Sequence, residues 1–307
     1  MNKDLRIVFM GTPEFAVAAL ESLLQEGWNV VAVVTAMDKP QGRGRKPKPS
    51  AVKACALQHN IPILQPPNLK SEAFLAELKA YRADLQVVVA FRMLPELVWS
   101  MPPKGTFNLH ASLLPDYRGA APINWVLING EEKTGVTTFF LQHEIDTGNI
   151  LFQEEEPIHP EDNAGSLYQR LMEKGARLVV RTVEAIASGN VEPKAQDHNK
   201  VRHQAPKIFR ETCEIDWAQP ATTIHQLVKG LSPYPGARCD LNGRSCKIYR
   251  TAVVKEEDTS LRAGEFETDN KTYIHFQTAK GLLALLELQV EGKRRMEVQE
   301  YLRGNRL

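Results

Sequence analysis

The feature that most constrains the fold is a series of short, almost continuous apolar runs separated by helical segments. Runs of this kind occupy residues 5–10, 30–34 and 85–91, and residues 15–25 between the first two follow a helical period. Apolar runs rich in Val and Ile are typical of parallel strands buried on both faces of a sheet, with helices as crossovers. The chain is therefore predicted to begin with a doubly wound α/β domain over residues 1–190.

The chain changes character after residue 190. Residues 165–186 are predicted to form one long helix, and residues 191–207 are polar without an apolar period, which predicts a linker. From residue 208 to residue 307, short alternating runs are separated by turn signals such as Asn242-Gly243. This pattern predicts a small β-barrel or sandwich as a second domain.

Composition excludes several classes of protein. The 307 residues contain 38 Lys and Arg against 37 Asp and Glu, so any nucleic-acid contact must come from a local patch. No apolar run reaches the roughly 18 residues that span a bilayer, and the N-terminus lacks the pattern of a secretory signal. The four cysteines form no Cys-x-x-Cys pair, which argues against a disulfide scaffold or a zinc site and favours a cytoplasmic setting.

Asn108 and His110 are the first candidates for a functional site. They lie two residues apart in a predicted strand, 105–111, so both side chains point to the same face. Ligands of open α/β sheets bind beyond the carboxyl ends of the strands, where an amide supplies a hydrogen-bond donor and an imidazole a proton or a positive charge. Spacing alone leaves open an ordinary strand end with two solvated polar side chains.

The segments that follow supply further candidates. Proline and glycine in residues 112–119 predict an ordered loop, and Pro122 can open a helix over 122–129. Leu113 and Leu114 in this loop need an apolar partner, which a ligand or a neighbouring helix could equally provide. Asp146, in Asp146-Thr147-Gly148, is also a candidate, although this spacing of Asp and Gly is common in ordinary turns.

Residues 38–49 carry an unusual density of positive charge. Glycines and prolines in the segment predict a loop that carries five cations: Lys39, Arg43, Arg45, Lys46 and Lys48. A solvated loop tip is one interpretation. Phosphate binding explains the clustering better, because cationic side chains release counterions from a nucleic-acid backbone.

Together these motifs resemble the folate-dependent formyltransferases. Residues 11–16 (Gly-Thr-Pro-Glu-Phe-Ala) resemble the start of that family, and Asn108-x-His110, residues 112–123 and Asp146-Thr147-Gly148 resemble its catalytic signature in order and spacing. The resemblance extends to residues 215–217 and 305–307, and so covers nearly the whole chain. It implies a Rossmann-like formyltransferase domain, a linker and a C-terminal barrel similar to an oligonucleotide-binding (OB) fold.

The resemblance also implies a reaction. A formyl group would pass from 10-formyltetrahydrofolate to the α-amine of methionine on initiator tRNA, directly, with no metal and no obligate protein partner. Asn108 and protonated His110 would stabilise the charge that develops on the formyl oxygen, at about 3–4 kcal/mol for one such donor. Asp146 would favour the imidazolium and accept the proton that leaves the amine.

The resemblance assigns two binding segments as well. The folate would be held by the loop Ser112, Leu113, Leu114 and Pro115. The tRNA acceptor end would be held by the basic loop, through Arg43, Arg45 and Lys46. One departure from the family lies at residues 91–95, because members commonly carry a longer, glycine-containing segment that lines the pterin pocket.

Other functions fit the sequence less well. Glycinamide ribonucleotide formyltransferases are normally shorter and lack the C-terminal barrel, and the nucleotide-sugar enzymes give no reason for the basic loop. A formyltetrahydrofolate hydrolase would replace the amine with water, and an inactive tRNA-binding module would not need Asn108, His110 and Asp146. A dehydrogenase is disfavoured because Gly11 does not begin the dinucleotide-binding glycine pattern.

Overall fold

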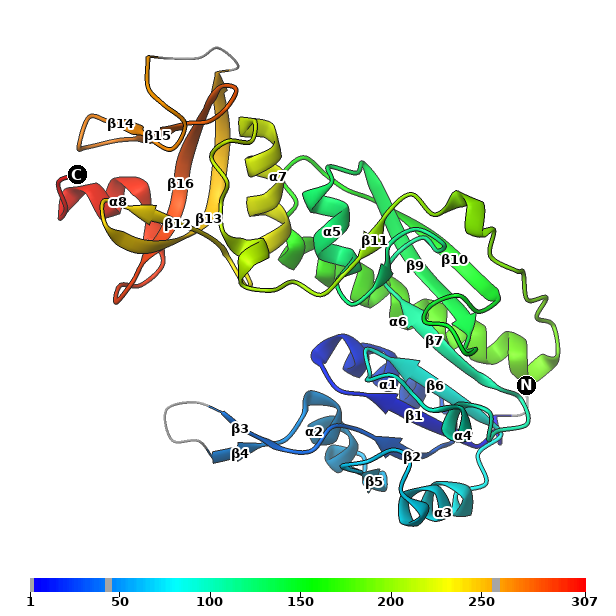
Figure 1. Ribbon diagram of the computed structural model, residues 1–307. Helices are drawn as coiled ribbons and strands as arrows, with labels where there is room; N and C mark the ends of the chain where they lie inside the picture. Colours follow the sequence, from blue (N-terminus) through cyan, green and yellow to red (C-terminus); the bar gives the residue numbers. More distant parts are fainter. Residues whose placement is uncertain (1–2, 42–45, 256–259) are drawn as a thin grey trace. The chain divides into compact units, whose positions relative to one another are not determined.

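The computed structural model describes residues 3–41, 46–255 and 260–307 (Figure 1). The chain forms two compact units, and each is built from three segments. The first unit comprises Met1–Gly119, Thr134–Glu156 and Gln169–Gln204; the second comprises Ala120–Lys133, Pro157–Tyr168 and Ala205–Leu307. The domain limits predicted at residues 190 and 208 stay a prediction, because the chain passes between the units more than once.

A seven-stranded sheet forms the centre of the first unit, in the order β10-β9-β7-β6-β1-β2-β5. Its strands are β1 (Ile7–Gly11), β2 (Val30–Val34), β5 (Ile63–Leu64), β6 (Leu85–Val89), β7 (Thr106–His110), β9 (Lys133–Phe140) and β10 (Ile150–Pro157). The five strands from β5 to β7 pair in parallel, and β9 pairs with β7 antiparallel. The predicted doubly wound α/β fold is confirmed, and β1 and β6 are buried along their whole length, as their apolar runs predict.

Helices cover both faces of this sheet (Figure 1). They are α1 (Glu14–Gln25), α2 (Ala51–Gln58), α3 (Glu72–Ala80), α4 (Glu96–Trp99) and most of α6 (Ala164–Ser188). Met10 and Val88 pack with residues of α3 and α4 in one apolar cluster. Leu109 of β7 points to the opposite face and meets Gly175 of α6, where an added Cβ would lie 2.7 Å from its Cδ2. A larger residue at Gly175 would therefore push the helix away from the sheet.

Short elements complete the first unit. They are a hairpin of β3 (Lys39–Gln41) and β4 (Lys46–Lys48), the strand β8 (Arg118–Gly119) and a 3-10 turn (His198–Lys200). Lys39 pairs with Lys48 across the hairpin, which we call the basic hairpin, residues 39–48. Arg43 and Arg45 lie outside the described residues, as does the side chain of Lys46.

An antiparallel sheet dominates the second unit, in the order β12-β13-β16-β15-β14, with β17 paired to β16. The strands are β12 (Ala237–Leu241), β13 (Arg244–Lys255), β14 (Phe266–Thr268), β15 (Ile274–Gln277), β16 (Leu282–Val290) and β17 (Met296–Glu297). Asn242 and Gly243 both have positive φ, 53° and 74°, and form the tight turn between β12 and β13. The predicted C-terminal β domain is confirmed.

The remaining elements of the second unit are helical or short. They are α5 (Pro122–Ile128), β11 (Gln204–Ala205, shared with the first unit), a 3-10 turn (Glu211–Cys213), α7 (Ala221–Leu231) and α8 (Val298–Arg303). Pro122 occupies the first turn of α5, as predicted. A bilayer-crossing helix is not found among residues 3–41, 46–255 and 260–307.

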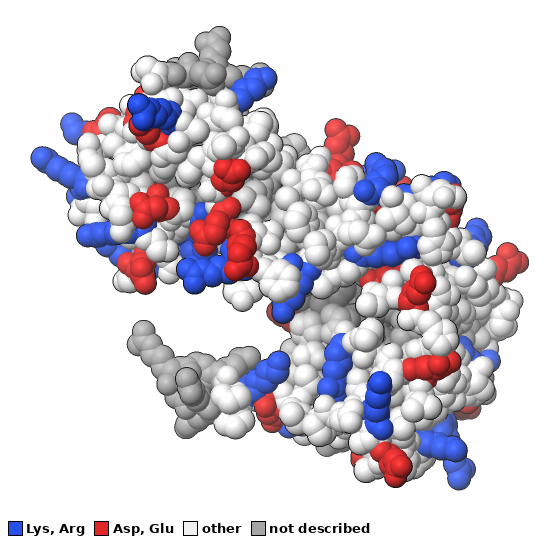
Figure 2. Space-filling view, viewed as in Figure 1, with Lys and Arg blue, Asp and Glu red and all other residues white. Residues whose placement is uncertain are grey.

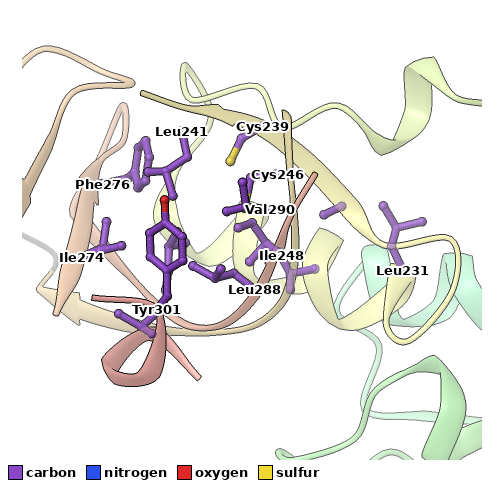
Figure 3. Packing of buried hydrophobic residues seen from close by; sticks show 14 of the residues in the cluster. Leu231, Cys239, Leu241, Cys246, Ile248, Ile274, Phe276, Leu288, Val290 and Tyr301 are labelled. Atoms are coloured by element: carbon purple, nitrogen blue, oxygen red, sulfur yellow. The ribbon is translucent and has the colours of Figure 1, made fainter. Parts of the chain in front are cut away.

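A large cluster of buried hydrophobic residues lies inside the second unit (Figure 3). Ile248 and Leu288 come from neighbouring strands of the sheet, and Tyr301 comes from α8. Cys239 lies opposite Cys246 on β12 and β13, and both are free, buried thiols, as the sequence indicates.

Candidate active site

The polar residues of interest lie at the carboxyl edge of the parallel strands. Val88 pairs with Asn108 in the β6–β7 register, so Asn108 and His110 lie on the face opposite Leu109. Gly11 ends β1 at the same edge, and an added Cβ there would lie 2.6 Å from the Cβ of Ala16 and 2.9 Å from the carbonyl oxygen of Val89. Only glycine lets α1 begin this close to the sheet, which explains the start of the motif at residues 11–16.

The imidazole of His110 is buried and held by one hydrogen bond. Its Nε2 lies 2.8 Å from the carbonyl oxygen of Tyr117, and its Nδ1 lies 3.9 Å from Oδ2 of Asp146. Because a carbonyl oxygen only accepts, Nε2 carries the proton. Nδ1 therefore faces Asp146, but the separation is too long for a hydrogen bond. Nδ1 is an acceptor when the ring is neutral and a donor when the ring is protonated.

Asp146 is aimed at His110 by an unusual backbone conformation. Its φ of 55° lies in the left-handed region, and its Oδ2 accepts the backbone N–H of Gly119 at 3.0 Å. Two residues on, a Cβ at Gly148 would lie 1.6 Å from the carbonyl oxygen of Phe140. The turn therefore requires glycine at position 148. The structure brings the predicted His110 and Asp146 together.

Asn108 completes the group that the sequence predicts. Its side chain is half-buried on the same face of β7 as His110. Within the part of the chain that the structure describes, its carboxamide makes no hydrogen bond, so its N–H groups are available to an incoming acceptor.

The predicted folate loop is held from the neighbouring strands β9 and β10. Thr137 Oγ1 donates to the carbonyl oxygen of Ser112 at 2.6 Å and accepts the N–H of Leu114 at 3.2 Å. Gln153 Nε2 donates to the carbonyl oxygen of Leu114 at 2.8 Å. Leu114 is buried, and Leu113 packs against Gly135 of β9, where a Cβ would lie 2.5 Å from its Cδ2. The loop is thus ordered by contacts within the protein, and Pro115 follows a cis peptide bond.

Asp116 ties this loop to residues 202–203. Its carboxylate accepts the backbone N–H groups of Arg202 at 2.6 Å and His203 at 2.9 Å, and the Arg202 guanidinium at 2.8 Å. Burial would raise the pKa of Asp116, but these hydrogen bonds outweigh burial and lower it. Tyr117, next in the chain, stacks on the ring of His203 with centroids 5.2 Å apart.

Two residues near Asp146 escape prediction from the sequence. Gln196 is 6% exposed; its Nε2 donates to the carbonyl oxygens of Asp146 and Gly148, and its Oε1 accepts from Arg118. Burial lowers the pKa of Arg118, and the neighbouring carboxylate of Asp146 opposes that shift. Arg118 stands in the predicted loop without an assigned role, and Gln196 stands in a polar segment without any sequence pattern.

Residues 91–95, where the sequence departs from the family, have a defined structure. Ala90 before them adopts φ 47°, a conformation that favours glycine. The guanidinium of Arg92 donates to the carbonyl oxygens of Pro66 and Pro67, and Met93 is 75% exposed. Hydrogen bonds from Arg92 therefore hold the beginning of this segment, and the apolar side chain of Met93 is exposed to solvent.

Basic side chains occur in two settings, in the basic hairpin of the first unit and among acidic side chains on the surface of the second unit. The start of the basic hairpin is fixed by Asp38, whose carboxylate binds Lys53 Nζ at 2.8 Å, while Gln65 contacts both. On the second unit, basic and acidic side chains alternate over the face shown in Figure 2, and Arg250 and Arg295 form ion pairs with Glu297 and Glu287. Among the described residues, no three His, Cys, Asp or Glu side chains are grouped to hold a metal ion.

Family comparisons cover both units. Residues 5–183 match the family described as Formyl transferase, and residues 207–306 match Formyl transferase, C-terminal domain. The chain is 53% identical to a methionyl-tRNA formyltransferase of Azobacteroides pseudotrichonymphae, over 98% of this chain and 96% of that protein. It is 51% identical to the methionyl-tRNA formyltransferase of Bacteroides thetaiotaomicron, over 100% of this chain and 97% of that protein.

Solved structures show the same fold at low identity. An N-formyltransferase from Helicobacter canadensis, in complex with folinic acid and dTDP-3-aminofucose, has a TM-score of 0.67 at 19% identity, over 94% of this chain and 99% of that one. HypX from Aquifex aeolicus, in complex with tetrahydrofolic acid, has a TM-score of 0.66 at 19% identity, over 97% of this chain and 46% of that one.

Proposed function

Because this chain belongs to the formyltransferase family, among the methionyl-tRNA formyltransferases, we propose that Asn108, His110 and Asp146 form its catalytic site. The enzyme transfers a formyl group from 10-formyltetrahydrofolate to the α-amine of methionine carried by initiator tRNA, for the initiation of translation. The folate, when bound, supplies the formyl carbon as an activated amide. The chain's own residues must then orient the amine, stabilise negative charge on the formyl oxygen and remove a proton.

The observation that carries the proposal is the geometry of His110. With Nε2–H committed to the Tyr117 carbonyl oxygen, only Nδ1 can exchange a proton with the site. The carboxylate of Asp146 lies 3.9 Å from Nδ1. When the ring carries a second proton, Nδ1–H is a charged donor that can stabilise the formyl oxygen as negative charge develops on it.

Asn108 and Asp146 take the other two roles. The half-buried carboxamide of Asn108, without a partner among the described residues, donates to the formyl oxygen from the same face as His110. Asp146 accepts the proton that the attacking amine loses. The Gly119 N–H holds the carboxylate in place for this step. No serine or cysteine is required, so transfer is direct, without an acyl-enzyme.

We assign folate binding to Ser112, Leu113, Leu114 and Pro115. Thr137 and Gln153 fix the backbone of this loop at the carboxyl edge of the sheet, which is where open α/β sheets bind ligands. A preformed loop loses little conformational entropy on binding. Rebuilding it should therefore weaken folate binding while the fold is retained.

We assign the tRNA acceptor end to the basic hairpin, through Arg43, Arg45 and Lys46. The start of the hairpin, next to Lys39, is anchored by the Asp38–Lys53 ion pair, and Lys39 pairs with Lys48 across the two strands. Basic side chains of residues 208–307, other than the ion-paired Arg250 and Arg295, would contact the tRNA backbone without sequence preference. We place the enzyme in the cytoplasm, acting without a membrane or an obligate protein partner, and its domains at 1–190 and 208–307, joined by residues 191–207.

The test is a formylation assay with the full chain. Incubation with 10-formyltetrahydrofolate and methionyl-tRNA should yield formylmethionyl-tRNA, while uncharged tRNA and free methionine should remain unformylated. Glycinamide ribonucleotide and an amino-sugar nucleotide serve as competing acceptors. Formyl transfer to either of these but not to methionyl-tRNA, or release of formate without an acceptor, would contradict the proposed function.

A further inference from the structure

We propose that Gln196 is a positioning residue for formyl transfer, which acts by holding Asp146 in its working orientation. The inference rests on the role proposed for Asp146. Gln196 lies after α6, in the segment between that helix and β11, and only 6% of it is exposed. A buried glutamine must satisfy both its N–H groups and its oxygen, so the position of its amide is defined by its partners.

The two N–H groups of Gln196 bind the backbone on either side of the turn that carries Asp146. Nε2 donates to the carbonyl oxygen of Asp146 at 2.9 Å and to that of Gly148 at 2.8 Å. Asp146 has φ 55°, a conformation that residues other than glycine adopt only when the surroundings determine it. Gln196 therefore stabilises the backbone conformation that aims the carboxylate at His110.

The oxygen of the same amide binds the opposite side of the site. Gln196 Oε1 accepts from Arg118, with distances of 3.2 Å to Nε and 2.5 Å to Nη2. The next residue, Gly119, donates its N–H to Oδ2 of Asp146. One side chain thus fixes both partners of the Gly119–Asp146 hydrogen bond, and with them the gap between Asp146 and His110 Nδ1.

The role predicts a specific kinetic effect. Gln196→Met keeps the length of the side chain and removes all four hydrogen bonds, so the carboxylate can drift from the attacking amine. Misplacement of a catalytic group by about 1 Å can cost up to about 100-fold in rate. We expect kcat to fall by about 10- to 100-fold, while KM for methionyl-tRNA and for 10-formyltetrahydrofolate stays within about twofold.

Gln196→Glu tests the N–H contacts of the amide separately from the contacts of its oxygen. Glutamate keeps an acceptor for Arg118 and loses the N–H groups, so carboxylate oxygens would face the carbonyl oxygens of Asp146 and Gly148. We expect kcat to fall at least as far as in Gln196→Met, although the contact with Arg118 is retained. Wild-type kcat in Gln196→Glu would overturn the proposal.

The closing experiment is a double-mutant cycle between Gln196→Met and Asp146→Ala, with thermal unfolding measured for each protein. Because Gln196 acts through Asp146, adding Gln196→Met to Asp146→Ala should lower kcat by less than about twofold. Gln289→Met is the matched control: Gln289 binds Tyr249 and Lys293 in the second unit, and its loss should leave kcat unchanged.

The outcomes distinguish failure of the positioning role of Gln196 from failure of the proposed catalytic site. A further loss of 10-fold or more from Gln196→Met in the Asp146→Ala background would overturn the positioning role and leave the proposed function standing. The same loss of kcat in Gln289→Met would likewise overturn it, because the loss of any hydrogen-bonded glutamine would then suffice. Wild-type turnover of Asp146→Ala would overturn the proposed site, and the role of Gln196 with it.

Discussion

Two buried regions of the protein contain different kinds of side chain. The edge of the sheet in the first unit buries polar groups, and each of these makes hydrogen bonds: His110, Ser112, Asp116, Thr137 and Gln196. The main apolar cluster of the second unit consists of aliphatic and aromatic side chains and cysteines packed between its sheet and helices (Figure 3). At the sheet edge, hydrogen bonds fix the positions of individual polar atoms. The apolar cluster is instead held by packing, which requires only that its volume be filled.

This difference between hydrogen bonding and packing predicts different roles for the two buried regions. A buried polar group that loses its partner costs about 1–3 kcal/mol, so a network of such groups is stable only in one arrangement. An apolar core tolerates small shifts, because dispersion and burial have little directional preference. Substitutions of the proposed catalytic residues at the sheet edge should therefore change rate more than stability, and substitutions in the apolar cluster of the second unit should do the reverse.

The largest effect is expected for His110→Ala. The substitution removes the imidazole that is proposed to donate to the formyl oxygen, so kcat should fall by about two to four orders of magnitude. The free energy of unfolding should change by only about 1 kcal/mol, for the lost hydrogen bond to Tyr117. Single-turnover formylation and urea unfolding measure the two quantities, and a folded variant with near wild-type turnover would contradict the site.

The opposite pattern is expected for Leu288→Ala in the second unit. Leu288 is fully buried, and its truncation should cost about 2–5 kcal/mol of unfolding free energy through lost contacts and a cavity. The kcat of the folded enzyme should stay within about twofold. Val254→Ala, at a 42% exposed position of the same sheet, is the control and should change stability by less than about 1 kcal/mol. A large loss of kcat in Leu288→Ala would remove the distinction between the two buried regions.

The elements that the sequence predicts well are those with a period. The apolar runs at β1, β2 and β6 predict buried parallel strands, and the Asn242-Gly243 turn predicts the β12–β13 hairpin. Asn108 and His110 are predicted together for the same reason, since the two-residue repeat of a strand places them on one face. In a regular strand or helix, the spacing of two residues in the sequence determines whether their side chains share a face. The positions of such residues can therefore be predicted from the sequence.

The partners of the site come from irregular segments, where spacing carries no such information. The carbonyl oxygen of Tyr117 and the amide of Gln196 depend on the path of the loops, and Gln196 is 50 residues from Asp146 in the chain. Residues 191–207 lack a period, and this favours a linker, yet Gln196 is buried and Ala205 is inaccessible to solvent. Hydrogen bonds to backbone carbonyls leave no side-chain pattern from which to predict them.

A smaller and pH-dependent effect is expected at Asp116. Hydrogen bonds from Arg202 and His203 lower its pKa in the folded state below the unfolded value of about 3.9. A lowered folded pKa means that the unfolded chain takes up the proton first as pH falls. The stabilisation is therefore present at neutral pH, and it is lost as pH drops below about 5 towards the folded pKa.

Asp116→Asn tests this contribution. The variant should be about 1–3 kcal/mol less stable than the wild type at pH 7, because charged hydrogen bonds are lost, and the difference should narrow by pH 3, below the unfolded pKa. Urea unfolding of both proteins at the two pH values gives the comparison. An equal difference at pH 7 and pH 3 would show that the charge of Asp116 contributes nothing.

The smallest effect is expected for Arg43→Ala combined with Arg45→Ala, and it extends the comparison to the surfaces of the two units. Each cation that contacts a single-stranded phosphate backbone contributes about 0.7 to the slope of log K against log salt concentration. Loss of two should lower the slope by about 1.4, while kcat at saturating tRNA stays unchanged. The matched control is Arg250→Ala with Arg295→Ala, since these guanidinium groups already neutralise Glu297 and Glu287. Equal slopes in both double variants would mean that the basic hairpin is no more a tRNA contact than the ion-paired surface of the second unit.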